Sequence, residues 1–76
     1  MAEIGHDYEL VVIGGGNMGA ALLGGLLRDG IVTAEQVAVV ELSDERRQVV
    51  AAEFPQVLVS ESIPTCRAAV LAVKPP

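Results

Sequence analysis

Apolar residues in this chain are grouped into short runs and one longer helical pattern. The first run, residues 10–13, holds four consecutive apolar side chains, three of them β-branched, which is typical of a strand buried on both faces. Glycines at 14–16 follow, and apolar residues then recur at helical spacing until Arg28, with Gly30 as a stop. The helical positions are Met18, Leu22, Leu23, Leu26 and Leu27. This order predicts a strand, a tight glycine turn and a helix.

Further apolar runs predict strands at residues 37–40, 57–59 and 68–73. Between the first two, Ser43 offers an N-cap ahead of two acidic residues, and a helical pattern follows over residues 47–54. The proline that comes next ends this second helix. The polar connection before the last strand has room for only about one or two helical turns.

This order of elements predicts an α/β fold, a Rossmann-like parallel sheet that forms half of a doubly wound fold with strand order 3-2-1-4. Right-handed crossovers place both helices on one face of the sheet. The connection at residues 60–65 is too short to cover the other face, and it leaves the fourth strand as an open apolar edge. We therefore expect residues 1–76 to be one domain of a longer protein, truncated after the fourth strand. Alone, it is expected to be marginally stable or self-associating.

Three glycines, Gly14, Gly16 and Gly19, follow the first predicted strand at the spacing G-x-G-x-x-G. In such a turn the first glycine lets the chain leave the strand, the second lets the backbone approach a pyrophosphate, and the third lets the helix pack closely on the strand. The first N–H groups of the helix then face the ligand at the positive end of the helix dipole. Glu41 ends the second predicted strand 22 residues after Gly19, close to the offset of about 20 for an acid that binds the ribose. Together, these features predict an NAD(P)-binding domain.

Composition and charge argue against other classes of protein. The net charge is −5 with only five basic residues, so no nucleic-acid partner is expected. Cys66 is the single cysteine, so neither a disulfide nor a metal site is expected, and a reducing compartment fits. Residues 10–27 carry no charge, but six of these 18 residues are glycine, and three adjacent glycines interrupt the run. We therefore expect a soluble, cytoplasmic domain without a membrane partner.

Three segments resemble the N-terminal domain of the pyrroline-5-carboxylate reductase family. They are Ile13-Gly14-Gly15-Gly16-Asn17-Met18-Gly19, Ala21-Leu22-Leu23-Gly24-Gly25-Leu26-Leu27 and Leu71-Ala72-Val73-Lys74-Pro75. Many dehydrogenases share the glycine motif, whereas its combination with the terminal Ala-Val-Lys-Pro is more selective. The resemblance covers the chain from Tyr8 to Pro75.

The resemblance implies reduction of the cyclic imine 1-pyrroline-5-carboxylate to L-proline with NADPH or NADH. It places the first segment on the cofactor phosphates and Glu41 at the adenosine ribose. It places Ala72, Val73, Lys74 and Pro75 along the nicotinamide end. In this family a helical C-terminal domain supplies the substrate groups and the dimer contacts. We therefore expect a homo-oligomer formed through that missing domain, no catalytic residue in this chain, and no useful turnover by the chain alone.

Glu41 bears on the choice between the two cofactors. A carboxylate at this position accepts hydrogen bonds from both ribose hydroxyls and repels a 2′-phosphate, so NADH preference or dual use is expected. Arg46 or Arg47 could still reach a 2′-phosphate. The sequence favours the simpler interpretation, that both arginines are solvated helix residues.

Alternatives remain open from the residues alone. A β-hydroxyacid dehydrogenase or a deazaflavin-dependent NADP reductase would share the same half-fold, although hydroxyacid dehydrogenases usually resemble Gly-Leu-Gly-x-Met-Gly at this turn. A protein of another class, a non-catalytic NAD(H)-sensing module, would also use this turn. An assay with pyrroline-5-carboxylate against hydroxy acids separates the enzymes.

Overall fold

The computed structural model describes residues 7–14 and 16–72, and these form an α/β sandwich of one parallel sheet and two helices. The elements are β1 (Tyr8–Ile13), α1 (Gly16–Arg28), β2 (Val37–Val40), α2 (Asp44–Glu53), β3 (Leu58–Ser60) and β4 (Cys66–Leu71). All strand pairs are parallel and the order across the sheet is β3-β2-β1-β4. The predicted fold class and strand order are confirmed.

Strands β1 and β4 each begin two residues earlier than predicted. Tyr8 pairs with Cys66, so β1 and β4 extend towards their N-terminal ends beyond the apolar runs at 10–13 and 68–73. The added positions include Glu9 and Arg67, whose exposed carboxylate and guanidinium approach to 3.9 Å. Charged side chains at solvent-facing positions of a strand break its apolar pattern without breaking its hydrogen bonds, which is why the pattern missed them.

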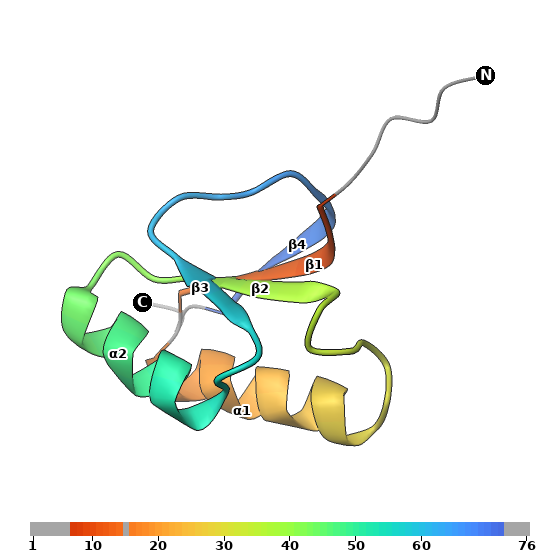
Figure 1. Ribbon diagram of the computed structural model, residues 1–76, viewed down its shortest axis with the longest axis horizontal. Coiled ribbons are helices and arrows are strands. Elements are labelled where there is room, and N and C mark those ends of the chain that lie inside the picture. The colour runs from red at the N-terminus through yellow and green to blue at the C-terminus, as the bar shows by residue number, and fades with distance from the viewer. Residues whose placement is uncertain (1–6, 15, 73–76) are drawn as a thin grey trace.

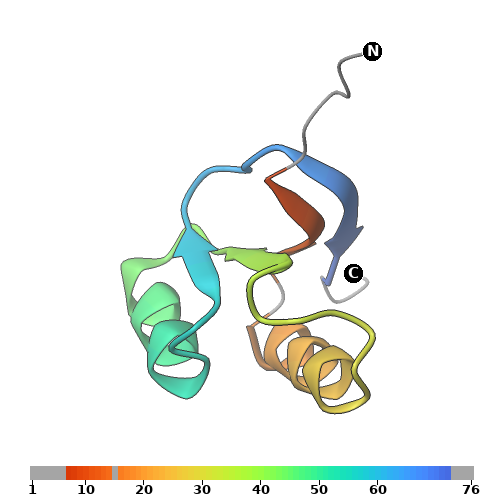
Figure 2. The same ribbon diagram turned by 45° about the vertical axis from the view of Figure 1, so that its right-hand side comes forward.

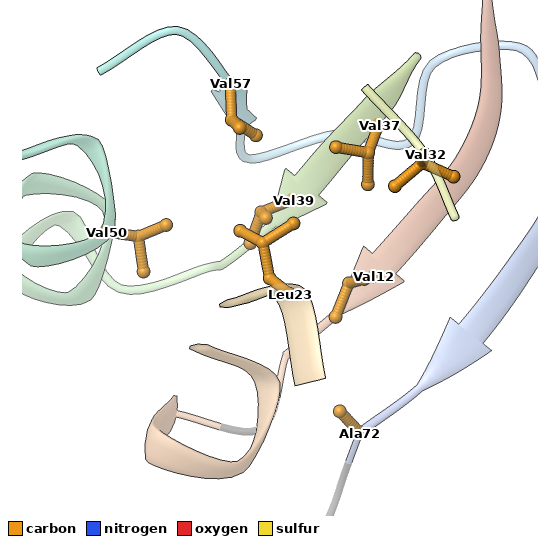
Figure 3. Packing of buried hydrophobic residues seen from close by; sticks show 8 residues of the cluster. All are labelled: Val12, Leu23, Val32, Val37, Val39, Val50, Val57 and Ala72. Atoms are coloured by element: carbon orange, nitrogen blue, oxygen red, sulfur yellow. The ribbon is translucent and has the colours of Figure 1, made fainter. Parts of the chain in front are cut away.

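Both helices lie on the same side of the sheet, as Figures 1 and 2 show. Between helices and sheet, a cluster of buried aliphatic side chains forms the main core, and Figure 3 shows how they face one another. Its members are Val12, Leu23, Val32, Val37, Val39, Val50, Val57 and Ala72. Leu23 is fully buried at the centre of α1, so this helix is fixed to the sheet by the face that the helical pattern predicted.

The second face of the sheet is not bare at its centre, contrary to expectation. Val11 and Ala38 are fully buried and Val40 is 5% exposed, although no described helix lies on that side. The connection from β3 to β4 passes over this side in Figures 1 and 2. This connection contains no helix, and the partly buried side chains that pack against the three are Tyr8, Ile13 and Cys66. Exposure is concentrated at the two outer strands, at Leu58 and Leu71.

No helix in the part of the chain that the structure describes has both the length and the apolar character needed to cross a membrane. The uncharged stretch that suggested a span is divided between β1 and the 13-residue helix α1.

Leu71→Lys is expected to reduce self-association of the chain. Leu71 is 69% exposed at the end of β4, which pairs with β1 alone among the described strands, and apolar edge strands favour pairing with other chains. Sedimentation velocity over a concentration series should show association of the unmodified chain and less association of the variant. Ile31→Lys is the control because Ile31 is 66% exposed outside the sheet. Equal association of both variants would contradict a role for the β4 edge.

Candidate functional site

The carboxyl ends of the four parallel strands meet at one edge of the sheet, where the predicted site residues come together. Three backbone hydrogen bonds continue the pairing of neighbouring strands one residue past the strand ends. The N–H of Gly14 donates to the carbonyl of Val40 (2.8 Å), and that of Ala72 to the carbonyl of Ile13 (3.0 Å). The N–H of Glu41 donates to the carbonyl of Ser60 (2.9 Å). The turn after β1 therefore lies between the residues that follow β2 and β4, where parallel sheets bind ligands.

Left-handed backbone at two glycines forms the turn between β1 and α1. Gly14 has φ 67° and Gly16 has φ 50°, a region in which a side chain costs about 1–2 kcal/mol. The predicted tight turn at Gly14 is confirmed. Gly16 begins α1, so its N–H is one of the helix N-terminal donors that have no partner within the helix.

Gly19 brings α1 close to the turn. Its Cα is buried, and a Cβ built on it would overlap the carbonyl oxygen of Gly14 and lie 3.6 Å from Cγ1 of Val12. The predicted close packing of helix on strand at the third glycine is therefore confirmed. It also sets the direction in which the first turn of α1 points.

Glu41 reaches the glycine turn through its side chain. The N–H of Gly16 donates to Oε2 of Glu41 at 3.3 Å, and the carboxylate is partly buried there. The structure thus brings together the glycine turn and the acid after β2, with Gly16 and Glu41 in contact although they are 25 positions apart in the sequence. The Glu41 carboxylate thus lies at the positive end of the α1 dipole, the place where a helix N-terminus favours negative charge.

Arg47 is not a solvated helix residue, contrary to expectation. Its Nη1 donates to the carbonyls of Glu41 (2.7 Å) and Leu42 (2.9 Å), and its Nη2 forms an ion pair with Asp44. The side chain is 19% exposed. Arg47 therefore fixes the connection between β2 and α2, and with it the backbone that carries Glu41.

Arg46 also differs from expectation, because it packs against the glycine turn. Its Nη2 lies 3.6 Å from a Cβ built on Gly16, and its Nε is buried without a hydrogen-bond partner in the described part of the protein. Ser43 caps α2 by accepting from the N–H of Arg46 at 3.3 Å, as predicted for an N-cap, and this orients the first turn of α2. The sequence left Arg46 as a candidate for a 2′-phosphate but favoured a solvated side chain for it.

A hollow of about 400 Å³ opens beside the turn at the same edge of the sheet. Its lining comes from the ends of β1 and β2 and from the connection after β3, and consists of Ile13, Gly14, Val40, Glu41, Leu42, Glu61, Ser62 and Ile63. Most of its wall is apolar, as is typical of sites for small molecules. Leu42 and Ile63 are 83% and 59% exposed, so they offer apolar surface to a flat ligand. The residues after β3 carried no motif and were not predicted.

The remaining predicted site residues lie around this edge or outside the described residues. Asn17 and Met18 are exposed in the first turn of α1, and Ala72 is buried after β4. Gly15, Val73, Lys74 and Pro75 fall outside the residues that the structure describes. Within residues 7–14 and 16–72, no group of three or more acidic, histidine or cysteine side chains is placed to hold a metal ion.

Comparison with known proteins gave one match, to a family model. The model described as NADP oxidoreductase coenzyme F420-dependent matches residues 9–76, which is most of the chain. No match was found among curated proteins or among solved structures. The matched range contains the glycine turn, Glu41 and all of the predicted nicotinamide-end residues. The chain therefore belongs to this NADP oxidoreductase family, as a dinucleotide-binding domain with a Rossmann-like sheet.

Proposed function

We propose that this chain is the cofactor-binding part of a reductase that converts 1-pyrroline-5-carboxylate to L-proline with NADPH or NADH. Membership in the NADP oxidoreductase family supports the reductase class. The observation that carries the binding proposal is the contact between the N–H of Gly16 and the carboxylate of Glu41 at the carboxyl edge of the sheet. The Gly-Gly-Gly-Asn-Met motif together with Ala-Val-Lys-Pro supports the substrate.

In this proposal the chain holds and orients the cofactor. The N-terminus of α1 and the bare backbone of Gly14 and Gly16 accept the pyrophosphate. Glu41 accepts from the ribose, and the apolar hollow beside it receives the adenine. The bound nicotinamide supplies the hydride, and the chain contributes its position rather than acid–base chemistry.

The functional test has two parts. The chain is titrated with NADH and NADPH, and the protein that contains it is assayed with pyrroline-5-carboxylate, with hydroxy acids and with reduced coenzyme F420. Binding of either nicotinamide cofactor and turnover of the imine are expected. Failure of both cofactors to bind would contradict the binding proposal, and turnover of a hydroxy acid alone would contradict the substrate.

A second candidate function is electron exchange between coenzyme F420 and NADP. The matched family, NADP oxidoreductase coenzyme F420-dependent, favours it directly, and the sequence had left a deazaflavin-dependent NADP reductase open. Both functions use the same nicotinamide site. Oxidation of reduced F420 by NADP, without activity on the imine, would select this second function.

Dual use of NADPH and NADH is proposed, with Arg46 as the residue that favours NADPH. Glu41 suits an unphosphorylated ribose, whereas the guanidinium of Arg46 lies beside the turn with an Nε that has no hydrogen-bond partner among the described residues. Hydrogen bonds to charged groups contribute about 1.5–3 kcal/mol. Arg46→Ala should therefore weaken NADPH binding about tenfold and NADH binding less than threefold, measured as Kd by fluorescence titration.

Arg28→Ala is the matched control for this prediction, because Arg28 lies in the last turn of α1, at the opposite end of that helix from the glycine turn. It should leave both dissociation constants unchanged. An equal loss of NADH and NADPH affinity in Arg46→Ala would assign that residue to the turn itself and not to the 2′-phosphate.

A further inference from the structure

The side chain of Glu41 occupies a donor that a bound dinucleotide also needs. The N–H of Gly16 is the first backbone donor of α1, and it already donates to Oε2 of Glu41 at 3.3 Å. A carboxylate at a helix N-terminus is stabilised by the positive end of the dipole, as a phosphate would be. The free protein therefore holds its own anion at the entrance to α1.

One N–H cannot serve the Glu41 carboxylate and a pyrophosphate oxygen at full strength, and two negative groups at that distance repel each other. We propose that Glu41 is an internal anion that competes with the cofactor pyrophosphate for the N–H of Gly16, and that it must leave this donor when the cofactor binds. This inference rests on the proposed function, because it names how that same site is regulated.

The exchange needs only a side-chain rotation. The backbone of Glu41 is held at both ends: its N–H donates to the carbonyl of Ser60 (2.9 Å) and its carbonyl accepts from Nη1 of Arg47 (2.7 Å). These bonds keep the Glu41 Cα in place while its carboxylate changes partner. The adjoining hollow, whose rim Glu41 forms, provides the space into which the carboxylate turns. Glu41 then has one role in the free protein, on Gly16, and another in the complex, on the ribose.

Inorganic pyrophosphate separates these two roles because it has no ribose. Glu41→Ala is expected to tighten pyrophosphate binding about tenfold, since a hydrogen bond between a carboxylate and an N–H donor is removed from the free state. Glu61→Ala is the matched control: it removes one negative charge from the same hollow without touching Gly16, and it should change the affinity less than threefold. Affinities are measured by isothermal titration calorimetry, with thermal unfolding as a check that each variant is folded.

The amide resonance of Gly16 provides a second readout. In the absence of ligand, Glu41→Ala should shift the Gly16 ¹H–¹⁵N resonance strongly, whereas Glu61→Ala should leave it in place. Equal tightening by both variants would assign the effect to net charge and overturn the proposal. Absence of pyrophosphate binding to Glu41→Ala, or an unmoved Gly16 resonance, would overturn it as well.

These outcomes are distinct from failure of the proposed function. If NADH and NADPH bind but Glu41→Ala brings no gain for pyrophosphate, the competition is wrong and the cofactor assignment stands. If neither dinucleotide binds while pyrophosphate affinity rises only in Glu41→Ala, the competition holds for the anion and the dinucleotide assignment is wrong.

Discussion

Gly19→Ala is expected to lower the free energy of unfolding by about 3 kcal/mol and to abolish measurable dinucleotide binding. The added Cβ would overlap the carbonyl oxygen of Gly14, and this neighbour is backbone that cannot rotate away. Either α1 moves off the sheet or the turn opens, and each change displaces the helix N–H groups that face the ligand. A chain of this length has a free energy of unfolding of only about 5 kcal/mol, so the loss is large. Urea unfolding and titration with NADH and NADPH measure the two effects.

Gly25→Ala provides the control for this substitution. Gly25 lies in the same helix, and a Cβ there would have only the Nη2 of Arg28 nearby, at an ordinary 3.8 Å. Alanine in an open helical position is expected to stabilise the protein by about 0.5–1 kcal/mol. A Gly19→Ala protein with unchanged urea midpoint and unchanged affinity would show that the close approach of α1 to the turn is not required.

The fold was predictable because the residue patterns that specify its strands and helices are local and recur along the chain. Runs such as residues 10–13 and 37–40 mark strands buried on both faces, and Leu23 and its neighbours mark one buried helix face. The handedness of strand–helix–strand crossovers then leaves one arrangement for the first three strands. The strand ends at Glu9 and Arg67 were missed because exposed charged positions carry no apolar signal.

The site was predictable only where the backbone itself requires a residue type. Left-handed φ at Gly14 and the crowded position of Gly19 restrict both to glycine, and the strand end places Glu41 beside them. The contacts of Arg46 and Arg47 depend instead on how α2 lies against the glycine turn. No local pattern distinguishes an arginine that packs there from one in solvent.

The burial at the centre of the second sheet face could not be predicted from the sequence either. Val11, Ala38 and Val40 are buried there although no described helix covers them, and the β3–β4 connection on that side has no regular structure between its ends. Polar residues and a proline in that segment indicated a loop correctly, but they did not indicate which surface the loop would cover. Which residues after β3 line the hollow depends on the path of this connection, and only the three-dimensional structure could supply them.

Gly16→Ala is expected to weaken NADH and NADPH binding about thirtyfold while the protein remains folded. The atoms nearest to a Cβ on Gly16 belong to the guanidinium of Arg46, at an ordinary 3.6 Å or more, so the free protein has room for it. The methyl group would nevertheless stand where the backbone must approach the pyrophosphate. The left-handed φ adds about 1–2 kcal/mol of strain. Gly30→Ala isolates this strain, because Gly30 has φ 73° and nothing within 4 Å of a built Cβ. Both variants should lose similar stability in urea unfolding, but only Gly16→Ala should lose cofactor affinity. If the two variants bind NADH and NADPH equally well, the pyrophosphate does not lie against this turn. A site that depends on bare backbone at Gly16 cannot tolerate a side chain there.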